Sequence, residues 1–476
     1  MGTVILIRPN FTRTLQPNPP IGLGYLASFL EKNNHKVILI DCRIRNISNE
    51  TLLNLIKKYR PQVVGITALT AYYEEMRKLC NFIYKKREEN DKQLNFLLII
   101  GGIHATALPE LSLLECKADL AVLGEGELTL LELIETINKN KSPFEIDGIA
   151  YLENGKIKFN KPRELIDDLD KIPFPAWHLM PPNTYPLDPH GHGFKRIPFA
   201  PIFTTRGCPF ACTYCASTNF WRRRIRFRSP KNVVEEMEFL MKNFGVREFH
   251  IWDDNFTISK EHAIEICREI IRRNMDITLK CPNGLRIDSL DEEILTWMKK
   301  AGFYQIVLAV ESASQRILNN VNKKLSLSKI PRVAKLASKI GLITKGFFIL
   351  GLPGETINSA LITLNYSKKI GLNFVSFFIA QPLPGSELFD QWTYGKQISH
   401  INWDDIQFNV GVYSLGYLSI EILTKLRNRG YLIFFFRLKI LFTLLKFPKV
   451  TINWSKNVLQ QIFRRFFERR IKRIWD

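Results

Sequence analysis

The chain has 476 residues, of which 46% are hydrophobic and 24% are charged, so it holds roughly two or three packed domains and wholesale disorder is excluded. Its formal net charge is +21 at pH 7, and the segment Glu421–Asp476 alone carries 14 lysines and arginines against three acidic residues. The chain starts with an apolar run at Val4–Ile7 and no charged region before it, which predicts that no leader is present. No run of roughly 18 uncharged apolar residues occurs, so no membrane-spanning helix is expected. Eight cysteines without an export signal predict a cytoplasmic protein without disulfides.

The first part of the chain alternates short apolar runs with amphipathic segments, the pattern of βα units around a parallel sheet. Strands are expected at residues 3–8, 36–41, 62–66, 95–100 and 119–122, and helices at 20–34, 50–59, 72–88, 106–115 and 126–138. Five such units predict a flavodoxin-like, doubly wound (Rossmann-type) α/β domain over residues 1–140. Domains of this kind bind ligands beyond the carboxyl ends of their strands.

Prolines crowd residues 141–197, which predicts a connector with little regular structure. A second alternation follows and predicts a partial (β/α)6 TIM-like barrel over residues 198–390, with its site at the carboxyl ends of the strands. Its strands are expected at 199–205, 247–252, 276–281, 304–310, 343–350 and 373–379, and its helices at 230–243, 260–273, 291–301, 328–340 and 355–369. Residues 391–476 are predicted to form a basic, α-helical C-terminal extension.

Three cysteines, Cys208, Cys212 and Cys215, lie directly after the first strand of the second series. Three thiolates on one loop can hold three irons of a [4Fe–4S] cluster and leave the fourth iron open to another ligand. A structural zinc site would require a fourth protein ligand, and the spacing of His190 and His192 fits no short zinc motif. The triplet therefore predicts an iron–sulfur site.

The spacing Cx3Cx2C on this loop of a six-unit barrel resembles the radical S-adenosylmethionine superfamily. The resemblance implies that the open iron binds the methionine part of S-adenosylmethionine, and that an electron from the cluster cleaves this cofactor to a 5′-deoxyadenosyl radical. It also implies an external electron donor such as flavodoxin or ferredoxin. Tyr214 stands where relatives place an aromatic residue near the adenine.

Polar and glycine-rich motifs follow the later barrel strands, where the resemblance implies contacts with S-adenosylmethionine. The implied residues are Asp253 and Asp254 after the second strand, Asn283 and Arg286 after the third, Glu311 and Ser312 after the fourth, and Gly351 and Pro353 after the fifth. Arg286 is expected to reach the ribose or the carboxylate of the cofactor. Each motif alone also suits an ordinary strand-to-helix turn, in which Asp and Asn cap the helix. Their order and shared position at strand ends favour a cofactor site.

The first domain resembles the cobalamin-binding domain that precedes the barrel in many radical S-adenosylmethionine enzymes. The residues implied to contact cobalamin are Gly22, Thr67, Leu69, Gly101, Gly102 and Glu125. One departure from the family pattern is the loop after the first strand, where Arg8–Arg13 replaces the motif that carries the cobalt-ligating histidine. A domain that has lost its ligand and only covers the active site is the alternative. His104 is expected to be a turn or tail-contact residue rather than a cobalt ligand.

Methylthiotransferases of the same superfamily, which act on RNA or protein, offer a competing interpretation because they carry three further N-terminal cysteines. Cys42, Cys80 and Cys116 have comparable spacings here. However, Cys80 and Cys116 fall within or beside predicted helices rather than at strand ends. The RNA-binding β-barrel of those enzymes is also not visible, so core or surface thiols are the favoured interpretation.

A run of arginines, Arg222–Arg228, follows the cysteine loop. The run could bind a phosphorylated or carboxylated substrate, or the propionamide rim of cobalamin. The alternative is a solvent-facing loop. The segments Tyr431–Lys446 and Phe463–Arg473 mix aromatic and basic residues, which predicts a helical cap over the barrel, with peripheral contact at the inner face of an anionic membrane as the alternative. No nucleic-acid module accompanies the charge, so nucleic acid is not an expected partner.

The resemblance therefore implies a radical enzyme that uses a [4Fe–4S] cluster, S-adenosylmethionine and cobalamin to methylate an unactivated carbon of a small-molecule or lipid-like substrate. Cobalamin-dependent cyclisation or rearrangement is the nearest alternative, because relatives with the same architecture perform both.

Overall fold

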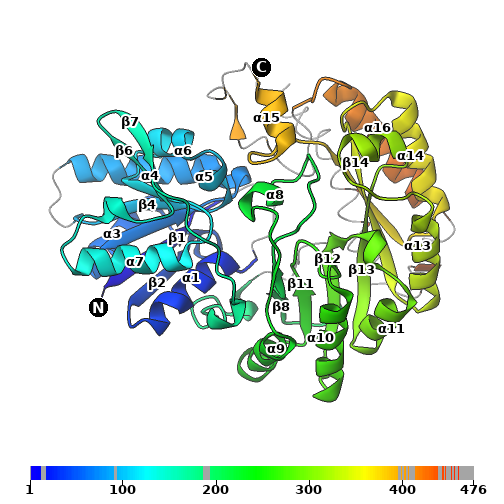
Figure 1. Cartoon of the computed structure of the whole chain (residues 1–476), viewed down its shortest axis with the longest axis horizontal. Coiled ribbons are helices and arrows are strands. Elements are labelled where there is room, and N and C mark those ends of the chain that lie inside the picture. The colour runs from blue at the N-terminus through cyan, green and yellow to red at the C-terminus, as the bar shows by residue number, and fades with distance from the viewer. Residues whose placement is uncertain are drawn as a thin grey trace. The chain divides into compact units, whose positions relative to one another are not determined.

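The computed structural model describes residues 2–11, 18–89, 94–185, 193–394 and 413–437, with further positions at 398, 401–403, 406, 442–443, 445, 452, 455 and 459. These residues form two compact units, whose elements are labelled in Figure 1. The first unit holds the chain up to Tyr185 together with Cys215–Arg228 and Leu383–Ile406, and the second holds the rest. The predicted domain bounds of 1–140, 141–197, 198–390 and 391–476 stay predictions.

A seven-stranded sheet forms the centre of the first unit. Its strands are β1 (Thr3–Arg8), β2 (Lys36–Asp41), β3 (Val63–Thr67), β4 (Leu97–Gly101), β5 (Leu120–Val122), β6 (Ile149–Glu153) and β7 (Lys156–Phe159). Their order is β2-β1-β3-β4-β5-β6-β7, with parallel pairing up to β5 and an antiparallel hairpin after it. The first five strands thus have the flavodoxin-like order, which confirms the predicted fold class for this part of the chain.

The helices of the first unit follow its strands. They are α1 (Ile21–Lys32), α2 (Cys42–Arg45), α3 (Asn49–Tyr59), α4 (Tyr73–Glu88), α5 (Ile103–Ala107), α6 (Pro109–Cys116) and α7 (Glu127–Asn138), with α8 (Ser217–Phe220), strand β10 (Arg226–Phe227) and α15 (Glu387–Thr393) from the later segments. Short 3-10 turns are η1 (Thr70–Tyr72), η2 (Pro143–Glu145), η3 (Leu169–Lys171) and η4 (Pro182–Thr184). One helix was expected at 106–115, but the chain forms two, because Leu108 precedes Pro109 and adopts a non-helical conformation.

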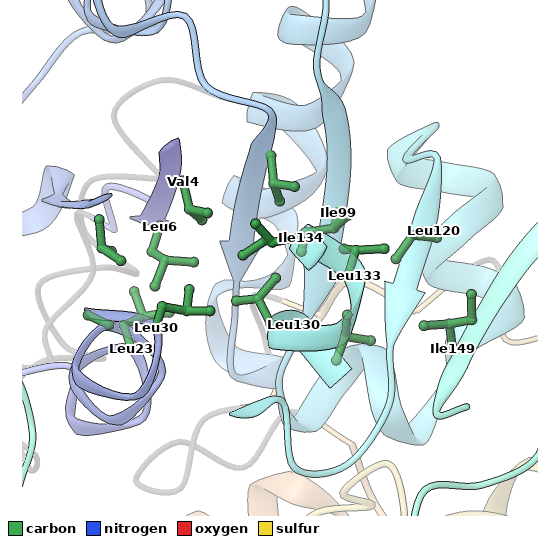
Figure 2. Close-up of a cluster of buried hydrophobic side chains, with 14 of the residues drawn as sticks. Val4, Leu6, Leu23, Leu30, Ile99, Leu120, Leu130, Leu133, Ile134 and Ile149 are labelled. Carbon is green, nitrogen blue, oxygen red and sulfur yellow. The ribbon is translucent and has the colours of Figure 1, made fainter. Parts of the chain in front are cut away.

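Apolar side chains from one face of the sheet and from two helices build the core of the first unit. Figure 2 shows Val4 and Leu6 of β1 facing Leu23 and Leu30 of α1, and the leucines and isoleucine of α7 near β4 and β5. Alternate residues of a strand point to the same face, which is why Val4 and Leu6 both enter this cluster. The packing fixes the loops at the carboxyl ends of the strands.

The hairpin β6–β7 differs from the irregular connector expected over residues 141–197. Its turn consists of Asn154 and Gly155, whose φ angles of 51° and 76° are left-handed. Asn-Gly is the dipeptide most favoured in two-residue hairpin turns, so a sequence signal for this hairpin was present. Between Phe159 and Tyr185 the only helical elements are the 3-10 turns η3 and η4, in keeping with the irregular structure that the prolines predicted there.

Six parallel strands form the sheet of the second unit. They are β8 (Phe199–Ile202), β11 (Glu248–Ile251), β12 (Thr278–Leu285), β13 (Phe303–Glu311), β14 (Ile343–Leu350) and β15 (Phe374–Ile379). The two-residue strand β9 (Thr205–Arg206) follows β8 and leads into the cysteine loop. Their order along the sheet is the order along the chain, which is that of a partial barrel. Every residue of β13 is buried, as expected for a strand covered on both faces.

Helices connect the strands of the second unit. They are α9 (Pro230–Phe244), α10 (Lys260–Arg272), α11 (Glu292–Lys300), α12 (Gln315–Asn320), α13 (Lys329–Lys339), α14 (Ile357–Lys369) and α16 (Ile420–Phe435), with the 3-10 turn η5 (Ile287–Ser289). Local sequence starts several of them, since Ser229, Ser259 and Thr356 each accept a hydrogen bond from the first turn. Strands and helices lie where they were predicted, except that the six-residue α12 was not anticipated.

Helix α16 packs on the last strand of the barrel. The backbone N–H of Phe377 in β15 donates to the Tyr431 hydroxyl over 3.1 Å, and the Cβ position of Gly430 is 2.9 Å from the Phe377 ring. Within the described residues, no helix is both long and apolar enough to cross a membrane. The predicted segments beyond Arg437 lie almost entirely outside the described residues.

Candidate active site at the strand ends

The cysteine loop begins at Gly207, whose φ of 99° lets the chain turn sharply after β9. Cys208, Cys212 and Cys215 are all half-buried, and burial raises the pKa of the Cys208 thiol. Among the described residues, no three His, Cys, Asp or Glu side chains already converge as a metal site. The donor set of three soft thiols on one partly accessible loop is what fits an iron–sulfur cluster.

Residues just after α12 hold the backbone of this loop. The Asn322 side-chain amide donates to the Ala211 carbonyl over 3.0 Å, and the Thr213 N–H donates to the Val321 carbonyl over 3.1 Å. Asn322 has a φ of 54°, in the left-handed region that asparagine tolerates better than most residues. Two hydrogen bonds thus fix the loop on both sides of Cys212.

Tyr214, Glu311 and Lys323 form a buried polar group beside the loop. The Tyr214 hydroxyl donates to Glu311 Oε1 over 3.1 Å, and Lys323 Nζ donates to the same oxygen over 2.8 Å. Burial alone would lower the pKa of Lys323, but the Glu311 carboxylate and the nearby Cys212 thiol outweigh it and the pKa is raised. The structure brings together two predicted residues here and adds Lys323, which sequence reasoning missed because Asn322-Lys323-Lys324 has the pattern of an exposed turn.

The backbone of Glu311 marks this end of β13 as unusual. Its φ of 64° is left-handed, a conformation that costs a residue with a long side chain on the order of 1 kcal/mol. Such a conformation persists only where surrounding contacts determine it, and here the two hydrogen bonds to its carboxylate do so.

The predicted residues after β11 and β12 lie close to one another. Asp253 is buried, and its Oδ1 accepts from the Thr204 N–H over 2.7 Å while its Oδ2 accepts from the Thr204 hydroxyl. Burial raises the pKa of Asp253 to about 6, against the effect of these hydrogen bonds. Asn283 is exposed and donates to the Trp252 carbonyl over 2.7 Å, whereas Asp254 is exposed and its charge helps to raise the Cys208 pKa. Asp254 and Asn283 are thus both exposed residues, and their roles toward a cofactor stay predictions.

Arg286 does not extend into solvent at the end of β12. It is 7% exposed, its Nη2 donates to the carbonyls of Lys323 and Lys324, and its guanidinium carbon lies 3.7 Å from the centroid of the Phe210 ring. The structure thus gives Arg286 protein partners at the cysteine loop, where a contact with ribose or carboxylate was expected.

The remaining predicted residues of the barrel serve turns or face other elements. Ser312 is buried, and its hydroxyl lies 3.4 Å from the Thr363 hydroxyl and accepts from the Ser314 N–H. Gly351 has a φ of 88°, and the Leu423 side chain of α16 lies 2.9 Å from its Cβ position.

The loop after β14 closes on a carboxyl group that the sequence had not singled out. The Gly351 N–H donates to Glu355, and burial raises the pKa of Glu355 to about 7. The carbonyl of Pro353 accepts from Asn320 over 3.2 Å. The roles of Ser312, Gly351 and Pro353 toward a cofactor stay predictions.

In the first unit, a separate set of predicted residues lies at the carboxyl edge of the sheet. Thr67 donates to the Gly101 carbonyl over 3.2 Å, and the Cβ position of Gly102 is 2.4 Å from the Thr67 hydroxyl oxygen. The chain's own packing therefore requires glycine at position 102. Leu69 is 42% exposed and Gly22 has open space around its Cβ position, which fits the close approach of a large, partly apolar ligand.

Glu125, also expected to contact cobalamin, is held in a buried ion pair. Arg226 Nη1 lies 2.7 Å from Glu125 Oε2, and the Ile166 N–H donates to the same oxygen over 2.9 Å. Other arginines of the basic run bind protein groups as well, since Arg222 donates to the Arg163 carbonyl and Arg224 pairs with Asp167. Part of the run is therefore internal structure rather than a free ligand-binding loop.

The loop after β1 and His104 show how this edge differs from a cobalt-ligating one. Arg8 is buried in an ion pair with Asp41, with 2.5 Å between Arg8 Nη2 and Asp41 Oδ2. His104 is fully buried, its ring stacks on Tyr73 with 4.0 Å between centroids, and burial lowers its pKa to about 3. His104 is thus a core residue of the first unit.

The three additional N-terminal cysteines are buried thiols. Cys80 and Cys116 lie within hydrogen-bonding range of each other inside the helical layer, and burial raises the pKa of Cys80 well above its usual value. Burial together with Asp41 raises the pKa of Cys42 to about 12. Such thiols are poor candidates for a second cluster, which needs readily formed thiolates.

Comparison with known proteins agrees with this arrangement. Residues 202–367 match the Radical SAM superfamily, and residues 8–134 match the B12 binding domain. The chain is 34% identical over 425 residues to an uncharacterized methyltransferase from Pyrococcus horikoshii, covering 89% of each protein. It is 31% identical to cytidylyl-2-hydroxyethylphosphonate methyltransferase from Streptomyces wedmorensis, covering 81% of this chain and 80% of the relative.

A solved structure shows the same fold at lower sequence identity. The radical S-adenosylmethionine methyltransferase TsrM from Kitasatospora setae, with cobalamin and a [4Fe–4S] cluster bound, superimposes with a TM-score of 0.69 at 20% identity. The match covers 83% of this chain and 75% of that one.

Proposed function

The chain belongs to the cobalamin-binding branch of the radical S-adenosylmethionine superfamily, and from that premise we propose that it transfers a methyl group to an unactivated carbon of a small-molecule or lipid-like substrate. The observation that carries this proposal is the loop of three half-buried cysteines, braced at the carboxyl edge of a partial barrel whose chain also holds a B12-binding domain. A relative that shares 31% identity over most of the chain is named cytidylyl-2-hydroxyethylphosphonate methyltransferase, which supports methyl transfer.

The residues present fit the family's cofactors. Cys208, Cys212 and Cys215 would hold the cluster, and the first-sheet edge around Gly22 and Leu69 would receive cobalamin. When bound, the cluster supplies the electron that cleaves S-adenosylmethionine, and cobalamin supplies the methyl group.

The chain's own polar groups would orient the cofactor. We assign Asp254 and Asn283 to contacts with S-adenosylmethionine. Both are exposed, the charge of Asp254 acts on Cys208, and Asn283 donates to the carbonyl of Trp252, two residues before Asp254. Next to the same loop, hydrogen bonds from Tyr214 and Lys323 hold the Glu311 carboxylate in place. The carboxylate and the Lys323 cation are thus already ordered, which lowers the free-energy cost of binding a polar ligand there. The buried Asp253 positions the backbone at Thr204.

The expected partners follow from the same chemistry. We propose an external one-electron donor such as flavodoxin or ferredoxin, and a cytoplasmic site of action. Contact with the inner face of a membrane is a further proposal, and the basic composition of the chain beyond Arg437 supports it.

Anaerobic purification with cobalamin present, followed by iron, sulfide and corrinoid analysis of one sample, tests the proposal. We expect about four irons and one corrinoid per chain, and dithionite-driven formation of 5′-deoxyadenosine. Cys208→Ala, Cys212→Ala and Cys215→Ala should each abolish this product, whereas Cys267→Ala, in the buried face of α10, should retain it.

Other metal contents would contradict the proposal in distinct ways. About four irons without corrinoid would leave a radical enzyme that does not use cobalamin. About eight irons would favour a methylthiotransferase and turn attention to Cys42, Cys80 and Cys116.

A further inference from the structure

We propose that Arg286 is a positioning residue that holds the cluster-binding loop in shape through Phe210, rather than a ligand of S-adenosylmethionine. The inference rests on the proposed function in that the loop carries a cluster. It goes beyond it by giving a role in cluster retention to a residue that follows β12.

The first observation is the way in which the Arg286 side chain is occupied. Its Nη2 donates to two carbonyl oxygens, of Lys323 and of Lys324, the latter over 2.9 Å. With 7% exposure, the side chain has little surface left for a ligand. A guanidinium donates from a fixed planar fork, so two carbonyl partners on Nη2 define the orientation of the whole plane.

The second observation is the aromatic ring that lies on this plane. Phe210 stands between Cys208 and Cys212 in the loop, and its ring centroid is 3.7 Å from the Arg286 guanidinium carbon. A cation over an aromatic face at this distance is attracted to the ring, most strongly where water is excluded. Fixing the Phe210 ring restricts the backbone that carries the two flanking thiols.

The third observation is that the contacts close into a ring. Residues 323 and 324, which accept from Arg286, directly follow Val321 and Asn322, which bond to the backbone of Thr213 and Ala211. Residues after α12 therefore hydrogen-bond to the loop backbone, and Arg286 contacts the loop through the Phe210 ring. Arg286 is itself anchored, because its carbonyl accepts from the Ser289 hydroxyl over 2.7 Å.

The same unit contains a matched arginine away from the loop. Arg437 donates to the carbonyls of Lys368 and Leu372 over 3.2 Å and 3.0 Å, and its guanidinium carbon lies 3.4 Å from the Phe434 ring centroid. Arg437 makes the same kinds of contact beside α14 and α16. Substituting Arg437 therefore controls for the loss of an arginine that bonds to two carbonyls and one aromatic ring away from the cysteine loop.

The experiment compares Arg286→Lys and Phe210→Leu with Arg437→Lys in the full chain, loaded anaerobically with iron and sulfide. Lysine keeps the positive charge but loses the planar fork, so the comparison separates geometry from electrostatics. Three quantities are measured for each variant: iron per chain, the rate of iron loss to a chelator, and S-adenosylmethionine bound per cluster by equilibrium dialysis.

We expect Arg286→Lys and Phe210→Leu each to speed iron loss by about tenfold and to lower iron content, with cofactor affinity per cluster changed less than about twofold. The variant that carries both substitutions should lose iron about as fast as the worse single variant. Both substitutions remove the same contact, that between Arg286 and the Phe210 ring. Arg437→Lys should match the wild type in iron loss.

Two results would overturn the proposal. One is full iron retention in Arg286→Lys with weakened cofactor binding, which would make Arg286 a cofactor ligand. The other is unchanged iron loss in Phe210→Leu, and this variant decides the matter if Arg286→Lys does not fold. Neither result depends on corrinoid binding or methyl transfer. Failure of the proposed function would instead appear in the iron and corrinoid content of the wild-type protein.

Discussion

At the scale of single residues, two carboxyl groups near the strand ends are buried with raised pKa values. Asp253 lies in a segment that the sequence singled out, because an acidic pair after an apolar strand is visible in the pattern. Glu355 was not singled out, since in Gly351–Thr356 it resembles an ordinary capping residue. Its burial comes from packing that no local pattern records. The same holds for Lys323 and for the contact between Arg286 and Phe210.

Glu355 makes stability depend on pH. Burial raises its pKa to about 7 from an ordinary 4.5, so the folded state binds more protons than the unfolded state between these values. The stabilisation that the buried Glu355 carboxyl gives is therefore fully present below about pH 4.5 and is lost as pH rises through 7. The free energy of unfolding falls by about 3 kcal/mol at most over this range. Replacing it by Gln should flatten the free energy of unfolding between pH 5 and about 7.5, measured by denaturant titration.

The control for this prediction is the exposed Glu88 near the end of α4. Its replacement by Gln should leave the pH profile of the wild type intact. If Glu355→Gln kept the wild-type slope, Asp253, whose pKa is raised to about 6, would be the better source of the pH dependence.

At the scale of elements, long periodic segments were predictable and short ones were not. The parallel strands of both sheets and the helices α9, α10 and α14 lie within a few residues of expectation, because their apolar patterns are regular along each segment. The hairpin β6–β7 was missed although Asn154-Gly155 marks it, since the surrounding prolines dominated the pattern. Helix α12 has only six residues, too few for a periodic signal.

The hairpin turn offers a clean measurement of backbone conformation. Gly155 has a φ of 76° and nothing within 4 Å of its Cβ position, so Gly155→Val meets no steric clash from other residues. It should nevertheless destabilise the protein by about 1–2 kcal/mol, because a β-branched residue disfavours left-handed φ. Asn154→Gly, at the neighbouring left-handed position, should change the unfolding free energy by less than about 1 kcal/mol. Equal losses in both variants would contradict this account.

At the scale of the whole molecule, the family and the parallel parts of both sheets could be predicted from the sequence, because cysteine spacing and βα alternation are local patterns. Contacts between distant segments were not accessible. The prediction of a helical cap for the region after residue 390 is supported for α16, which packs on β15 and against Gly351.

Two truncations separate the role of α16 from that of the basic residues beyond it. Removing residues 438–476 deletes ten lysines and arginines but leaves α16, so the midpoint of thermal unfolding should fall by only a few degrees. Removing residues 420–476 exposes β15 and should yield aggregated protein. Binding to vesicles with anionic lipid is measured on the shorter deletion, and retained binding there would contradict membrane contact through the tail.

The bracing of the cysteine loop also sets an order in time. Ala211 and Asn322 are 111 residues apart, so during synthesis the thiols emerge long before the segment that holds them. At about 5–20 residues per second, the loop waits at least several seconds for its support. Cluster assembly on a nascent chain would meet a loop without these hydrogen bonds, so we expect stable cluster insertion only after the fourth βα unit of the barrel has folded.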